Sequence, residues 1–156
     1  MEIEKKFLTK QIPFDISKFP HTEIEQSYIS TDPVIRIRKS GNSFILTVKG
    51  SGHISREEYE IPLNEKQYNN LAKKSDSDTI LKTRYFIPLG CGLTAETDIY
   101  HGQLNGLITT EVEFKTSADA ESFAAPQWFG IDISLDSRYK NASLAINGLP
   151  KNLYQQ

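Results

Sequence analysis

Charged side chains occupy alternate positions at the start of the chain. Glu2, Glu4 and Lys6 form a Glu-x-Glu-x-Lys run, and Ile3 and Phe7 lie at positions of the opposite parity. Because successive side chains of a β-strand point to opposite faces, a strand here places two carboxylates and an ammonium on one face. Carboxylates can hold divalent cations, and ammonium groups can hold phosphate. The run therefore predicts an ion-binding face rather than an ordinary apolar core.

The same period-two pattern returns in five later segments. It joins Arg36 to Arg38, Arg56 to Glu58 and Glu60, Lys82 to Arg84, Glu96 to Asp98, and Glu111 to Glu113 and Lys115, and Lys49 belongs to the same set. One such strand usually marks the solvated face of a sheet. Recurrence in six segments favours one shared, enclosed face. Arg and Lys in pairs suit multidentate recognition of phosphate.

The strands that carry these residues are separated by short turn-forming segments. We expect strands at 2–8, 23–30, 34–39, 43–49, 55–61, 79–87, 93–101 and 107–115, and helices at 65–74, from Thr116 or Ser117 to Ala124, and between Asp136 and Gly148. About eight strands can close into a barrel with an enclosed interior. The expected fold is therefore α+β: an eight-stranded antiparallel β-barrel, or tunnel, with a charged interior and helices packed outside.

Size and composition narrow the classes of protein. A chain of 156 residues suits a single domain, 1–156. The net charge of −2 argues against a nucleic-acid partner. The single cysteine, Cys91, the charged N-terminus and the absence of an apolar run of about 18 residues predict a cytoplasmic protein that does not span a membrane. The sequence leaves open whether the chain is a monomer or a homodimer.

The ordered set of motifs resembles the CYTH superfamily, also called triphosphate tunnel metalloenzymes, in its small bacterial single-domain form. The hallmark of that family is Glu-x-Glu-x-Lys at the start of an eight-stranded, charge-lined tunnel. The resemblance continues through Arg36-Ile37-Arg38, Thr47-Val48-Lys49-Gly50, Lys82-Thr83-Arg84-Tyr85, Glu111-Val112-Glu113 and a tail with Trp128-Phe129-Gly130, Asp136, Tyr139, Asn141, Ala142 and Leu144. The chain departs from the bacterial pattern at Ala95, where that pattern often has Trp, and in Gly90-Cys91-Gly92-Leu93.

The resemblance implies metal-dependent hydrolysis of a triphosphate. Inorganic tripolyphosphate is favoured because nothing in the sequence indicates a nucleobase pocket. The implied metal ligands, for Mg²⁺ or Mn²⁺, are Glu2, Glu4, Glu60, Asp98, Glu111 and Glu113. The implied substrate-binding residues are Lys6, Arg36, Arg38, Lys49, Arg56, Lys82 and Arg84. Glu4, Lys6, Arg38 and Glu113 are expected to be catalytic.

Three other functions stay open at this level. One is a class IV adenylate cyclase, which converts ATP to cyclic AMP and pyrophosphate. Another is hydrolysis of thiamine triphosphate or a nucleoside triphosphate, and the third is a non-catalytic sensor of polyphosphate or nucleotides. Glu58, Glu96 and Lys115 fit structural ion pairs as well as a place at the rim of the site. Tyr139 and Asn141 are expected to position the tail near a tunnel mouth.

Overall fold

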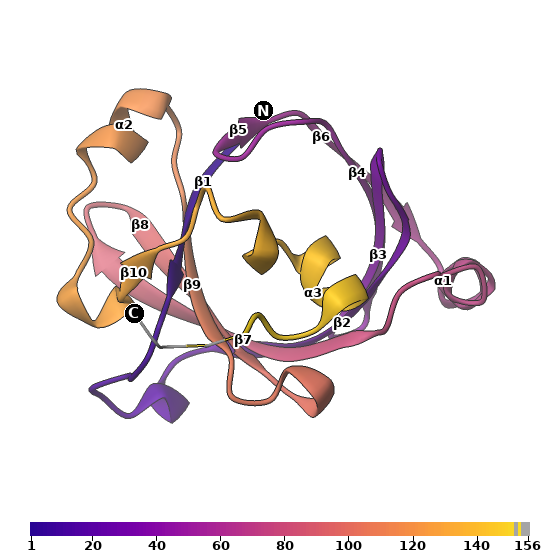
Figure 1. Cartoon of the computed structure of the whole chain (residues 1–156), viewed down its shortest axis with the longest axis horizontal. Helices are drawn as coiled ribbons and strands as arrows, with labels where there is room; N and C mark the ends of the chain where they lie inside the picture. Colours follow the sequence, from indigo (N-terminus) through magenta and orange to yellow (C-terminus); the bar gives the residue numbers. More distant parts are fainter. Residues whose placement is uncertain (152, 154–156) are drawn as a thin grey trace.

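A single antiparallel sheet curves into a ring in the computed structural model, which describes residues 1–151 and 153 (Figure 1). Within these residues, the long strands of the wall are β1 (Glu2–Leu8), β2 (His21–Thr31), β3 (Val34–Ser40), β4 (Ser43–Lys49), β6 (Glu58–Leu63), β7 (Ile80–Gly90), β8 (Leu93–Tyr100) and β9 (Ile108–Glu113). The short strands β5 (Ser55–Arg56) and β10 (Ile131–Asp132) join the same sheet. The predicted barrel is confirmed; β10 is a strand beyond the eight expected, and β5 is the first part of the segment expected as one strand at 55–61.

The ring closes where the segment 55–63 changes the strand with which it pairs. The strand order is β10-β1-β9-β8-β7-β2-β3-β4-β6, and β5 pairs with β1. Because β5 and β6 are adjacent in sequence, they connect β1, next to one end of this order, with β6 at the other end. The prediction of one continuous strand over 55–61 is therefore wrong: residues 55–56 pair with β1, whereas residues 58–63 pair with β4. The carbonyl of Glu57, at the break, accepts a hydrogen bond from the amide of Gly50 at 2.8 Å.

Strand register brings the charged pairs together across the sheet. Glu4 lies opposite Glu113, and Glu111 lies opposite both Lys6 on β1 and Glu96 on β8. Paired residues of neighbouring strands project to the same face. Segments that are far apart in sequence thus share one inner surface, as the period-two pattern predicted.

Helices α1 and α2 lie outside the ring, as expected (Figure 1). The long helices are α1 (Glu65–Ala72), α2 (Ser117–Ser122) and α3 (Asn141–Asn147), and the short 3₁₀ turns are η1 (Ile16–Lys18), η2 (Gly102–Leu104), η3 (Gln127–Phe129) and η4 (Ser137–Tyr139). Asn64 is the N-cap of α1, and Gln67 completes a capping box with it. Ala120 of α2 joins Ile3, Phe7 and Val112 in a buried apolar cluster.

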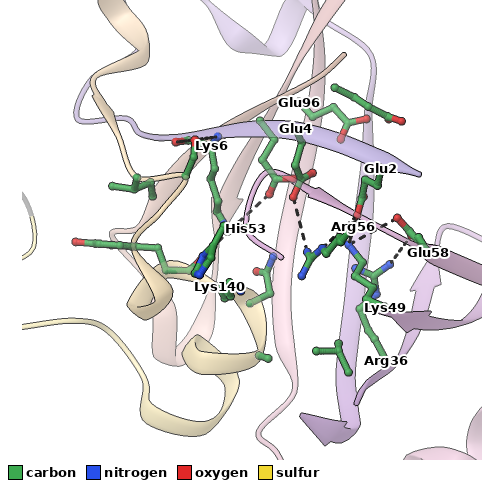
Figure 2. Close-up of a pocket in the computed structure, with 18 of the residues that line it drawn as sticks. Glu2, Glu4, Lys6, Arg36, Lys49, His53, Arg56, Glu58, Glu96 and Lys140 are labelled. Atoms are coloured by element: carbon green, nitrogen blue, oxygen red, sulfur yellow. Dashed lines mark hydrogen bonds and ion pairs between the residues drawn. The ribbon is translucent and has the colours of Figure 1, made fainter. Parts of the chain in front are cut away.

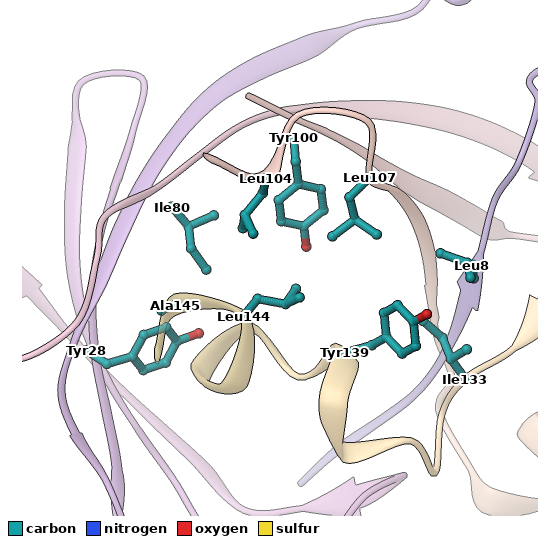
Figure 3. Packing of buried hydrophobic residues seen from close by; sticks show 10 residues of the cluster. All are labelled: Leu8, Tyr28, Ile80, Tyr100, Leu104, Leu107, Ile133, Tyr139, Leu144 and Ala145. Atoms are coloured by element: carbon teal, nitrogen blue, oxygen red, sulfur yellow. The ribbon is translucent and has the colours of Figure 1, made fainter. Parts of the chain in front are cut away.

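Helix α3 lies inside the ring, which corrects the expectation that every helix packs outside (Figure 1). Its Leu144 and Ala145 pack with Tyr28, Ile80 and Tyr100 from the barrel wall (Figure 3). The tail therefore fills one end of the barrel with apolar side chains, and the charged interior occupies the remainder. No helix among the described residues has the length and apolar character needed to cross a membrane.

Candidate active site

A cavity of about 590 Å³ occupies the part of the barrel that α3 leaves free (Figure 2). Most of the predicted site residues line it, namely Glu2, Glu4, Lys6, Arg36, Arg38, Lys49, Arg56, Glu60, Arg84, Glu111 and Glu113. Lys82 and Asp98 are not among the lining residues. The fold thus gathers eleven of the thirteen predicted residues around one space and places the other two beneath it, inside the barrel.

Lys82 and Asp98 form a buried ion pair beneath the cavity. The Nζ atom of Lys82 lies 2.7 Å from Oδ2 of Asp98, and neither side chain is exposed. Arg84 donates from Nε to Oδ1 of Asp98 at 2.7 Å and from Nη2 to Oδ2 at 2.8 Å. Both oxygens of Asp98 are therefore occupied by cationic donors. Burial lowers the pKa of Lys82 to about 7, although the charge of Asp98 opposes that shift.

Arg84 lines the cavity but is largely committed to acids of the barrel. In addition to its two bonds to Asp98, its Nη1 donates to Oε2 of Glu96 at 2.7 Å. Its Nη2 also lies 3.8 Å from Oε1 of Glu111. In this arrangement Arg84 holds carboxylates in place and has few donors left for a ligand. Glu96, for which the sequence left two readings open, takes part in this structural network and also lines the cavity.

A second cluster of charges lies where β1, β4 and β5 meet. Lys49 Nζ lies 3.0 Å from Oε2 of Glu2 and 3.8 Å from Oε2 of Glu58, and Arg56 Nε lies 3.5 Å from Oε2 of Glu2. Burial and a hydrogen bond with Glu2 raise the pKa of Glu58 to about 7. Glu58 thus belongs to the cavity wall. Its place on the predicted charged face was the signal in the sequence that pointed to it.

The acids of β1 and β9 repel one another inside the cavity. Burial, followed by the charges of Glu111 and Glu2, raises the pKa of Glu4 to about 8. Glu113 lies opposite Glu4 in the sheet and is exposed. A divalent cation would relieve such crowding, and carboxylate oxygens are the ligands that Mg²⁺ and Mn²⁺ prefer. Within residues 1–151 and 153, no three such side chains are already arranged as a ready-made metal site.

Arg36 and Arg38 offer donors that acids of the barrel do not fully use. Arg36 Nη2 donates to Thr47 at 3.1 Å, and its buried Nε has no hydrogen-bond partner among the described residues. Arg38 Nε donates to Gln26 at 2.8 Å, and no acid in the described part of the chain lies within ion-pair distance of Arg38. Burial, reinforced by the charges of Arg36 and Arg84, lowers the pKa of Arg38 to about 10. This pair of arginines is therefore suited to an anionic ligand.

Segments outside the strands complete the cavity, and the strand pattern did not predict their contribution. They supply His53 from the loop before β5 and Ser134, Asp136 and Lys140 from the tail. The expected positioning role of the tail agrees with two contacts. Lys6 Nζ donates to the carbonyl of Tyr139 at 2.8 Å, and Tyr100 donates its hydroxyl proton to Oδ1 of Asn141 at 2.7 Å.

Three comparisons with known proteins indicate the same family. The family model of the CYTH domain matches residues 1–138. The chain is 36% identical to an inorganic triphosphatase of Nitrosomonas europaea over 149 residues, which cover 94% of this chain and 97% of that protein. It is 33% identical to an inorganic triphosphatase of Acetivibrio thermocellus over 150 residues, which cover 94% of each chain. A crystal structure of an inorganic triphosphatase matches with a TM-score of 0.70 and 33% identity, covering 96% of this chain and 97% of that one.

Proposed function

Because the chain belongs to the CYTH domain family, we propose that it is a metal-dependent triphosphatase whose favoured substrate is inorganic tripolyphosphate. The observation that carries this proposal is one cavity in which underused arginine donors face crowded carboxylates. A polyanion satisfies the first group and a divalent cation satisfies the second. The relatives described above act on an inorganic triphosphate, which supports the same substrate class.

The cationic side chains are proposed to bind and neutralise the triphosphate. Arg36 and Arg38 project from β3, Lys49 from β4 and Lys6 from β1 into the same space. In phosphoryl transfer the protein acts mainly by positioning the phosphates and stabilising charge. These residues would therefore hold the chain of phosphates in one register and stabilise the charge that develops on the leaving pyrophosphate.

The acids of the cavity fit a divalent cation. Glu2, Glu4, Glu60, Glu111 and Glu113 would hold Mg²⁺ or Mn²⁺, because they are the cavity carboxylates that the sequence marked. When bound, such a cation supplies polarisation of phosphate oxygens and of water. Glu113, exposed at the end of β9, is the acid proposed to orient the attacking water at its carboxylate oxygens. Water addition at the terminal phosphorus then gives phosphate and pyrophosphate.

The filled end of the barrel favours a compact substrate. Tyr28 and Ala142 line the cavity and lie at the apolar end that α3 occupies. This end offers no free space for a nucleoside to extend into, because Leu144 and Ala145 pack against the wall there. A nucleotide would therefore have to place its base toward the open side of the cavity. Inorganic tripolyphosphate needs no such pocket.

Product analysis tests the proposed function. Tripolyphosphate, ATP and thiamine triphosphate would each be incubated with the protein and Mg²⁺ or Mn²⁺, and phosphate, pyrophosphate and nucleotide products would be separated. We expect phosphate and pyrophosphate from tripolyphosphate at a rate well above those for the other two substrates. Cyclic AMP formed from ATP would replace this proposal with a cyclase. Tight binding of tripolyphosphate without any product would replace it with a sensor.

A further inference from the structure

Lys140 is a cation of the cavity that does not come from the barrel wall. It lies in the tail between η4 and α3 and lines the cavity with the strand residues. Its two neighbours are anchored: the carbonyl of Tyr139 accepts from Lys6 Nζ, and Asn141 accepts from the hydroxyl of Tyr100. The backbone at Lys140 is thereby fixed against β1 and β8. Its side chain is consequently directed by the fold and does not hang from a free tail.

The ammonium of Lys140 reaches across to the loop before β5. Its Nζ donates to the carbonyl oxygen of Gly52 at 3.3 Å, and no acid in the described part of the chain lies within ion-pair distance of it. An ammonium has three N–H donors, so a carbonyl satisfies only one of them. Burial and the nearby charge of Arg56 lower the pKa of Lys140, which agrees with a cation held close to other cations. The remaining donors lack the acid that most cavity cations have.

The loop that Lys140 contacts is held at both ends and also lines the cavity. Gly50 donates its amide proton to Glu57, and the carbonyl of Ile54 accepts from the amide of Glu4 at 3.0 Å. Between these points Gly52 adopts a φ of +126°, and a Cβ there would collide with the carbonyl of Ser55. His53 lies next to Gly52 and lines the cavity. Figure 2 shows Lys140 and His53 to one side of Arg56, Lys49 and Arg36.

We propose that Lys140 is a further substrate-binding residue, which holds a phosphate of the triphosphate and the carbonyl of Gly52 at the same time. The proposal rests on the proposed function and assigns that site an additional contact from the tail. A phosphate oxygen takes a second N–H of the ammonium, as a charge-assisted hydrogen bond. Substrate binding is thereby coupled to the position of the loop 50–54. Cations of the strands surround the phosphates on the other sides of the cavity, and the tail and the loop complete the binding site on this side.

Substitution of Lys140 by Gln tests this role. We expect Lys140→Gln to raise both the KM for tripolyphosphate and its Kd by about tenfold, the size of one charge-assisted hydrogen bond. The kcat should change less than about twofold, because the contact is made in the ground state as well as in the transition state. Lys140→Arg should recover most of the affinity. Lys66→Gln is the matched control, because it removes the same charge from an exposed position on α1, outside the barrel.

Hydrogen exchange of the loop gives a second readout. Addition of tripolyphosphate should slow amide exchange in residues 50–54 of the wild-type protein and of Lys66→Gln, and should slow it less in Lys140→Gln. An unchanged KM, or a fall in kcat at constant KM, would overturn the proposal, as would equal protection of the loop in both variants. If the wild-type protein releases no phosphate, the proposed function fails. If the wild type is active and Lys140→Gln matches it, only the role of Lys140 fails.

Discussion

The two ends of the barrel interior are built from the same strands and contain opposite chemistry. On β7, Ile80 faces the apolar end, whereas Lys82 and Arg84, two and four residues later, belong to the ionic part. On β8 the order is reversed, with Glu96 in the cavity wall and Tyr100 in the apolar cluster. Because the alternation is continuous along each strand, side-chain parity determines only what faces inward. Whether a part of the inner face packs against α3 or lines the cavity determines whether it stabilises the fold or can bind a ligand.

The boundary between these parts is a single layer of residues. Lys82 Nζ lies 2.7 Å from Asp98 and 5.3 Å from the ring centroid of Tyr100. It therefore contacts the ionic network on one side and the apolar cluster on the other. The pair occupies the deepest part of the ionic half, where water is excluded and an unpaired charge is costly. This layer separates a cavity that can take a ligand from an end that stabilises the fold.

The largest expected effect on stability is that of Asp98→Asn. This change leaves Lys82 and Arg84 buried without their common acid, and breaking a buried pair typically costs about 3–5 kcal/mol. Urea unfolding should show a loss of about 4 kcal/mol in the free energy of unfolding. Glu60→Gln is the control, because it changes an exposed acid on the same face. A variant Asp98→Asn as stable as the wild type would mean that the boundary layer is not held by this network.

A slightly smaller effect is expected at the apolar end. Leu144→Ala removes a fully buried side chain of α3 and should lower the free energy of unfolding by about 3 kcal/mol. Well below its melting temperature, the variant should keep a kcat close to that of the wild type, because Leu144 does not line the cavity. Ile146→Ala on the same helix is the control, since Ile146 is exposed. Loss of turnover in the folded Leu144→Ala protein would show that the two ends are not separable.

The smallest effect concerns how stability depends on pH in metal-free buffer. The pKa of Glu4 is raised to about 8 and that of Glu58 to about 7, so between about pH 4.5 and these values the folded protein binds protons that the unfolded chain has released. Their contribution therefore makes stability fall as pH rises through this window. In Glu4→Gln, the fall in melting temperature between pH 5 and pH 7 should be smaller than in the wild type by a few degrees. Leu144→Ala should lower the melting temperature equally at every pH. If the melting temperature of Glu4→Gln depended on pH as steeply as that of the wild type, Glu4 would not have the raised pKa.

The sequence predicted the strands well because charged and apolar side chains alternate regularly along each of them. The bounds of β1 and β4 agree with the expected 2–8 and 43–49. The same pattern could not show that α3 enters the barrel, because an apolar helix face packs equally well inside or outside a ring. It also could not show the break near Glu57, because Arg56 and Glu58 keep the same parity across it and both line the cavity.

The sequence predicted which residues belong to the candidate site better than it predicted which of them reach the cavity. Parity placed Asp98 and Lys82 on the inner face correctly, but position along the strand decided whether they reach the cavity or lie beneath it. His53 and Lys140 belong to irregular segments, whose side chains no periodicity can orient. Their place follows from tertiary contacts such as that of Lys140 with Gly52. The direct roles proposed for the lining residues stay predictions.

Phosphate release from tripolyphosphate by the wild type and by Glu4→Gln, measured side by side with Mg²⁺ or Mn²⁺, shows whether the ionic half of the barrel is the active site. We expect rapid release by the wild type and a kcat at least about 100-fold lower in the variant, by analogy with the loss of one preorganised catalytic group. The melting temperature of Glu4→Gln in metal-free buffer should equal or exceed that of the wild type, because the variant no longer buries an acid whose pKa is raised by burial and by neighbouring acids. Turnover by Glu4→Gln at the wild-type rate would contradict the assignment of the ionic half as the active site.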